Sequence, residues 1–463
     1  MPGPTEELRG QLKKLAVRIR TDVTEGLADQ SIVPENETVL RWKVDHFDYG
    51  ATGITSFGAH GEQVTRKTWY KSWVKLTQAI GKLSEYDTVL RGLKSEFGND
   101  SQIESHLRAF TSLLVRELLS NPAIGDEAID EMITNFSRNL QDEPVRYRVQ
   151  AAIIGVAIES EKTDLSPRDG IFLRRPKKED LEVEATEFSY WGTRPLSPQP
   201  SAILTMELMA KRGREVQDQL ERAISILRLF GIGSVVWSSY QVNSDSVTDP
   251  FGSASMHSGR QTQALETYLL TDDDLSKLRK FWQACEKTMP VGFYDLGQTT
   301  TDSLTIAYNR YTDSLLQNGL LERRIANSMM GLEALFLKGT EIQELTYRLT
   351  VRIAKFLGLL GYDSHRVRAG LIDAYRVRNL FAHGSQLDKK EKKRIESKYK
   401  DVKNLLKETL DYLRVSLVTS ILIGIKKSEL VDHLDGSLID REREERISSL
   451  VSPVSEIVHK RSQ

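Results

Sequence analysis

Hydrophobic residues in the first part of the chain recur at intervals of three and four, which places them on one face of a helix. In residues 6–27 this face consists of Leu8, Leu12, Leu15, Ile19 and Val23. The spacing predicts helices over Glu6–Leu27, Trp69–Leu83, Gln102–Leu119 and Asp126–Leu140. Gly50–Gly61 contains four glycines and is expected to be a loop.

The pattern changes near Arg148, where compact apolar runs replace the helical spacing. Val149–Ile158 is a compact apolar run. The segments after it that favour strands are Gly170–Arg175, Leu181–Ala185, Ile203–Met209 and Val235–Val242. Helical spacing returns in Gln217–Phe230, while Ser197–Ser201 and Asn243–Gly259 are expected to be loops. Thr271 precedes three aspartates, which suits the start of a helix. A metal site at these aspartates is the weaker alternative, because the glycine and distal glutamate of a calcium loop are missing.

The last third of the chain has helical spacing almost throughout. The expected helices are Ile306–Leu315, Leu320–Leu337, Ile342–Leu360, Arg366–His383, Lys390–Val415, as one helix or broken into two, and Val415–Ile425. Their connections contain Gly339, Gly361 and Gly384, so neighbouring helices are expected to pack antiparallel. Glu333 lies beside an apolar stripe, either as a carboxylate at its boundary or as a buried or partner-facing one.

These patterns predict a mostly α chain, α+β overall. The expected organisation is a mainly helical region over 1–160, a mixed α/β region over 161–300, a helical bundle over 301–430 and a charged tail over 431–463. From Asp435 onward the tail is expected to be a solvated helix or disordered.

Composition is typical of a globular protein, with 39% hydrophobic and 28% charged residues. The single cysteine, Cys285, excludes an internal disulfide and a structural zinc site built on several thiolates. We expect no secretory signal, because the chain starts without an apolar segment, and no ordinary transmembrane helix. A reducing, cytoplasmic location is therefore expected.

The net charge of −1 conceals a division along the chain. Residues 1–300 carry 36 basic and 43 acidic groups, whereas residues 301–463 carry 28 basic and 22 acidic groups. A basic final third on an acidic body can steer an anionic partner to one place.

Catalytic residue types cluster at meaningful spacing in one segment, Tyr375–Gly384. Asn379 and His383 are four residues apart, so on a helix their side chains can meet. Arg378 and His383 lie about 140° apart around an ideal helix, and can converge on one ligand only where the helix bends or ends. Gly384 supplies such an end. Histidine exchanges protons near neutral pH and arginine matches phosphate oxygens, so the set suits phosphodiester cleavage without a metal. A surface histidine at a helix end is the alternative interpretation.

This segment resembles the motif of the HEPN superfamily (higher eukaryotes and prokaryotes nucleotide-binding), in which an arginine is followed, after four to six residues, by a histidine. The surrounding helices agree with it: Met330–Phe336 lies in an early helix, Leu345–Leu349 opens the next, and Tyr375–Arg378 follows. Over about residues 305–430 the chain is most similar to the Apea-type HEPN branch of microbial defence proteins.

The resemblance implies a metal-independent endoribonuclease without a cofactor, in which two protomers pair so that their motifs line one cleft. His383 would be the acid/base group, Arg378 would bind the scissile phosphate, and Asn379 would orient His383 or the substrate. RNA would be selected because it alone carries the 2′-hydroxyl nucleophile. In that branch the activity serves abortive phage defence, so a phage-derived trigger or an antitoxin is a candidate partner.

Basic residues around the motif are candidates for RNA binding. They are Arg376, Lys389, Lys390, Lys392, Lys393 and Arg394, with Lys398 and Lys400 further on. A solvated helix face explains them equally well, because acidic residues are interleaved. Tyr308 and Tyr311 are expected to pack between domains rather than stack on bases, and His365 is expected to be a surface or capping residue.

Two hypotheses from different classes follow. In the first, the bundle cleaves RNA and the acidic N-terminal part senses a signal or restrains it. In the second, the bundle is a non-catalytic scaffold for dimerisation or for nucleotide or RNA binding. The complete set of Arg378, Asn379 and His383 favours the ribonuclease, because a scaffold has no chemical need for all three.

Overall fold

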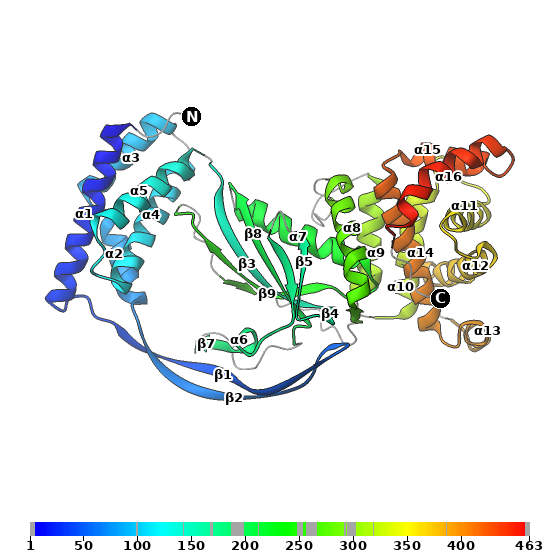
Figure 1. Cartoon of the computed structure of the whole chain (residues 1–463), viewed down its shortest axis with the longest axis horizontal. Helices are drawn as coiled ribbons and strands as arrows, with labels where there is room; N and C mark the ends of the chain where they lie inside the picture. Colours follow the sequence, from blue (N-terminus) through cyan, green and yellow to red (C-terminus); the bar gives the residue numbers. More distant parts are fainter. Residues whose placement is uncertain are drawn as a thin grey trace.

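The computed structural model of the chain describes residues 5–98, 101–141, 143–166, 170–186, 199–211, 213–247, 253–255, 266–290, 293, 302–317, 319–385 and 387–458. Helices predominate and the strands form a few small sheets, so the predicted mostly α, α+β class is confirmed. Figure 1 shows an elongated arc with helices at both ends and a sheet between them. None of the helices described is long and apolar enough to cross a membrane.

The N-terminal helices form a unit with its own hydrophobic core. They are α1 (Glu6–Ala28), α2 (Tyr70–Ile80), α3 (Ser84–Phe97), α4 (Ser101–Ser120) and α5 (Asp126–Leu140). Four of them match the predicted helices, and α3 was not predicted. The Thr5 side chain caps α1 by accepting a hydrogen bond from the Leu8 N–H group.

A long antiparallel hairpin follows α1, and here the predicted loop over Gly50–Gly61 is wrong. Strand β1 (Glu35–Gly50) pairs with β2 (Gly53–Thr68), and only two residues turn between them. The glycines make room for large side chains of the opposite strand. A Cβ atom on Gly58 would lie 2.4 Å from the His46 ring, and one on Gly61 would lie 3.0 Å from Leu40.

The tip of this hairpin is fastened to the middle of the molecule. Tyr49 donates a hydrogen bond from its hydroxyl to the Ser201 carbonyl (2.6 Å) and accepts one from the Ile158 N–H group (3.0 Å). Strand β7 (Val183–Thr186) pairs with β1. In Figure 1 the hairpin runs below the sheet, from the N-terminal helices towards β4.

The central sheet has the strand order β10-β9-β3-β8-β6-β5, with antiparallel neighbours. Its strands are β3 (Val145–Ile154), β5 (Lys162–Ser166), β6 (Ile171–Arg174), β8 (Ala202–Ala210), β9 (Val236–Ser244) and β10 (Ser253–Ser255). The parallel pair β4 (Val156–Ile158) and β11 (Tyr268–Leu270) lies beside it, and α6 (Lys178–Leu181) is a single turn.

Two predictions about this part of the chain need correction. Strand β3 starts at Val145, before the region boundary predicted at residue 160. The loop predicted over Asn243–Gly259 contains the end of β9 and all of β10, because β10 pairs with residues 239–241 of β9. The rest of that loop beyond residue 247, and Ser197 and Pro198 of the predicted connection, lie outside the described residues.

Two helices, α7 (Gly213–Phe230) and α8 (Asp272–Thr288), connect the sheet to the C-terminal helices. One continuous core extends from β3 to residue 458, across the boundary predicted at residue 300. Polar anchors reinforce the junction: Tyr311 donates to the Arg228 carbonyl (2.9 Å), and the buried Arg414 donates to the Phe230 carbonyl (3.0 Å).

The C-terminal bundle comprises α9 (Ser303–Leu316), α10 (Leu321–Phe336), α11 (Leu345–Leu359), α12 (Ser364–Ala382), α13 (Lys389–Tyr399), α14 (Val402–Ile423), α15 (Lys427–Gly436) and α16 (Arg441–Ser455). The first four match the predicted helices. The segment Lys390–Val415 is broken at Lys400, which has a positive φ of 66°. The separate helix predicted from Val415 is wrong, because α14 runs through Val415 without interruption. The tail is not a fully solvated segment, because Ile447 and Val451 on α16 are fully buried.

Candidate functional site

The predicted motif lies at the C-terminal end of α12, and the helix ends as its sequence predicts. Gly384 adopts a φ of +70°. Its N–H group donates to the Phe381 carbonyl (3.0 Å), and the Ser385 N–H group donates to the Leu380 carbonyl (2.9 Å). This hydrogen-bond pair is a Schellman motif, which satisfies the last carbonyls of a helix. His383 is therefore the capping residue, at the point where the helix leaves its regular path.

Arg378 is held by side chains from two helices. Its Nη2 atom lies 3.1 Å from Oε2 of Glu333 on α10, and its Nη1 atom donates to Oδ1 of Asn379 (3.3 Å). Its Cζ atom is 5.7 Å from the ring centroid of Tyr375, one turn earlier. The guanidinium therefore has a defined orientation while 28% of the side chain stays exposed.

Glu333 is a half-buried carboxylate at the boundary of the core, the first of the two interpretations of its sequence position. Its side chain is 18% exposed and faces Arg378. Burial raises the pKa of Glu333 above its ordinary value, although the charge and hydrogen bond of Arg378 oppose the rise. Since the carboxylate balances the guanidinium, a phosphate at this site would compete with Glu333 for Arg378.

His383 is exposed, and within the part of the chain that the structure describes its imidazole has no hydrogen-bond or ion-pair partner. The contact expected between Asn379 and His383 is not among the hydrogen bonds of the described residues. Asn379 contacts Arg378 instead, so here it orients the guanidinium. The structure thus places Arg378, Asn379 and Glu333 together and leaves the histidine ring free in water.

The predicted RNA-binding residues fall into two groups. Four lysines of α13 are exposed to solvent, namely Lys389, Lys390, Lys392 and Lys393. The two arginines are paired: Arg376 lies 3.5 Å from Glu391, and Arg394 contacts both Glu391 and the buried Asp373. Arg394 is therefore a structural anchor of α13, and the lysines are the cations that remain accessible to an anionic partner.

The other sequence candidates have structural explanations. The hydroxyl groups of Tyr308 and Tyr311 are bonded within the junction between α7 and α9, as expected for packing residues. Asp274 accepts hydrogen bonds from Thr271 in a capping box at the start of α8. Among the described residues no group of three or more His, Cys, Asp or Glu side chains is arranged to hold a metal ion.

Asp373 is a polar residue of α12 that the sequence patterns did not single out. It is 1% exposed and accepts hydrogen bonds from three residues of α13: Arg394, Lys398 (3.0 Å) and Tyr399 (3.1 Å). These contacts lower the pKa of Asp373 against the opposing effect of burial. One feature of the sequence could have identified Asp373 as a buried carboxylate. It is a lone acidic residue between the apolar Ile372 and Ala374, in a helix otherwise rich in arginine.

Comparisons with protein-family models, with curated proteins and with solved structures found no match to the chain. The chemistry of the residues at the end of α12 is therefore the basis for a functional proposal.

Proposed function

We propose that the chain is a metal-independent endoribonuclease of the HEPN type. The observation that supports this most is the guanidinium of Arg378, held by Glu333 and Asn379, in the last turns of the helix that ends at the exposed His383. A fixed cation for a phosphate and a free imidazole for proton transfer are the two groups that RNA cleavage needs.

In the proposed reaction the 2′-hydroxyl attacks the adjacent phosphorus and the P–O5′ bond breaks. One histidine takes the proton of the 2′-hydroxyl or supplies a proton to the departing 5′-oxygen. Arg378 stabilises the negative charge that develops on the phosphoryl oxygens, after the phosphate has displaced Glu333. The products are a 2′,3′-cyclic phosphate and a 5′-hydroxyl.

A homodimer is part of the proposal, because one protomer offers a single imidazole for two proton transfers. Ile372 is an apolar side chain on the same helix, is 44% exposed, and would lie in the proposed dimer contact. It lies four residues before Arg376 and eleven before His383, so the exposed stripe of α12 leads to the motif. We place the protein in the cytoplasm and propose phage defence as its role, with residues 1–300 as sensor or regulator.

The alternative is a scaffold that binds RNA or nucleotides without cleaving them. One observation favours it: Glu333 already compensates the charge of Arg378, and nothing in the described residues fixes the ring of His383. One outcome separates the two functions. If variants of the motif lose cleavage but still bind RNA and dimerise, the ribonuclease is supported over the scaffold.

The test is cleavage of labelled RNA by purified protein in the presence of EDTA. The variants are Arg378→Ala and His383→Ala. The matched controls are Arg323→Ala, at an exposed arginine of α10, and His365→Ala, at an exposed histidine of α12. We expect a loss of roughly 10²-fold or more for His383→Ala, the range typical of general acid–base groups, and unchanged rates in the controls.

Cleavage at the wild-type rate by both motif variants would overturn the proposal. RNA binding by the wild type without cleavage, under all triggers tested, would support the scaffold instead. An RNA with a single 2′-deoxy nucleotide at the cut site should resist cleavage, because its nucleophile is missing.

A further inference from the structure

A pocket of about 360 Å³ lies at the junction between the central region and the bundle, and none of its lining residues belongs to α12. Strand β11 and the residues just before it form one wall, and α14 forms another. The end of α7 and the start of α8 complete it. This volume is within the range of small-molecule sites.

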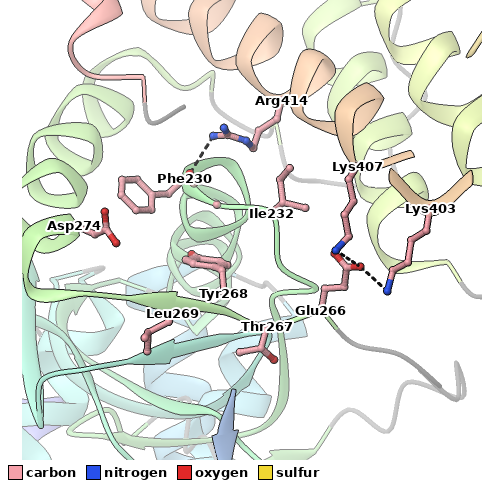
Figure 2. A pocket seen from close by; sticks show the side chains of 11 residues that line it. Phe230, Ile232, Glu266, Thr267, Tyr268, Leu269, Asp274, Lys403, Lys407 and Arg414 are labelled. Atoms are coloured by element: carbon pink, nitrogen blue, oxygen red, sulfur yellow. Dashed lines mark hydrogen bonds and ion pairs between the residues drawn. The ribbon is translucent and has the colours of Figure 1, made fainter. Parts of the chain in front are cut away.

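The pocket has a charged end and an apolar part. Figure 2 shows Glu266, Lys403 and Lys407 gathered at one end, with Tyr268 and Ile232 between them and Phe230. Pockets that bind small molecules are typically lined by apolar side chains together with a few polar groups that converge on the ligand.

One carboxylate serves two lysines at the charged end. The Nζ atoms of Lys403 and Lys407 lie 3.1 Å and 3.4 Å from the same oxygen, Oε1 of Glu266. Two cations therefore share one carboxylate, and these three side chains together keep a positive excess.

Glu266 is well placed to act as an internal substitute for an anionic ligand. Its backbone is held by the hydrogen bond from the Ser234 N–H group to its carbonyl (2.7 Å), whereas its side chain is 22% exposed and extends to the lysines. Lys403 is 45% exposed, so an anion has access to the pair. A phosphate offers separate oxygens and a second negative charge to two lysines that now share one oxygen.

We propose that this pocket binds a small phosphomonoester with an apolar or aromatic body, whose phosphate displaces the Glu266 carboxylate from Lys403 and Lys407. The apolar body lies against Ile232 and Tyr268, towards Phe230. The ligand replaces an ion pair that joins the central region to the bundle, so it binds where the two parts meet. This site is independent of the proposed ribonuclease activity.

The test is calorimetric titration of the full chain with phenyl phosphate, with inorganic phosphate and phenol as the two halves of that probe. We expect saturable binding of phenyl phosphate that is tighter than binding of either half. Glu266→Gln removes the internal competitor and is expected to tighten binding roughly tenfold, the worth of about one charge-assisted hydrogen bond. Lys403→Met with Lys407→Met keeps the aliphatic stems and is expected to weaken binding at least roughly tenfold.

The matched control is Lys280→Met with Lys287→Met, which removes two exposed lysines of α8 outside the pocket and should leave binding unchanged. Absence of saturable binding in both the wild type and Glu266→Gln overturns the proposal, and so does binding that is insensitive to Lys403 and Lys407. Equal affinity for phenyl phosphate and inorganic phosphate overturns the assignment of the apolar part. Because Glu266→Gln is expected to gain affinity, misfolding cannot imitate the expected result.

Discussion

Replacing Asp373 by asparagine is expected to detach α13 from the bundle while the rest of the fold persists. Asp373 is 1% exposed, and three residues of α13 donate hydrogen bonds to its carboxylate. Ile395 is the single buried residue among the described residues of α13. The docking of this helix therefore depends mainly on one apolar side chain and one carboxylate.

The size of the effect follows from the geometry of these contacts. Each hydrogen bond to a charged group contributes on the order of 1.5–3 kcal/mol, but the cost of burying the carboxylate offsets part of their sum. Arg394 and Lys398 keep 30% and 49% of their side chains exposed, so water can solvate them after the substitution. We therefore expect the free energy of opening α13 to fall by about 2 kcal/mol, equivalent to roughly 30-fold faster amide exchange.

Hydrogen exchange of the full chain, followed in peptides that cover residues 389–399 and in peptides from α14, measures this change. Glu396→Gln is the matched control, since Glu396 forms an exposed ion pair with Lys392 at 3.9 Å. Such pairs contribute less than about 0.5 kcal/mol, so exchange should change by less than roughly threefold. Exchange of α13 within threefold of wild type in Asp373→Asn would refute the reasoning. An equal acceleration in α14 would also refute it, because the loss would then be global.

Two further predictions concern the motif and the hairpin. Because burial raises the pKa of Glu333 above its ordinary 4.5, the stability it contributes is complete below that value and is lost as pH rises through the folded-state pKa. The wild type should therefore lose stability relative to Glu333→Gln as pH rises above 4.5, and a constant difference in unfolding midpoint would contradict this. Tyr49→Phe removes both hydrogen bonds of the hairpin tip and should lower the free energy of unfolding by about 1–3 kcal/mol in denaturant titration. The exposed Tyr70→Phe is its control, and equal stability of the two variants would show that the tip is not an anchor.

The helices α9 to α12 of the bundle and the end of α12 were predictable from the sequence, because their signals are local. Apolar spacing of three and four residues identifies a buried face, and Gly384 after the last helical residues identifies the end. The hairpin was not predictable from glycine content. At Gly58 the absence of a side chain makes room for His46 on the other strand, and this relation exists only once the strands pair.

Sequence alone determined which residue types stand together: Arg378, Asn379 and His383 within one helix end, and an excess of basic residues in the last third. Tertiary structure decided what each of them contacts. Glu333 is 45 residues from Arg378 in sequence, and Glu266 is 137 residues from Lys403. The physical reason is that spacing along a helix specifies neighbours within a few turns, whereas the charge that balances a buried or half-buried group comes from whichever element the core packs against it.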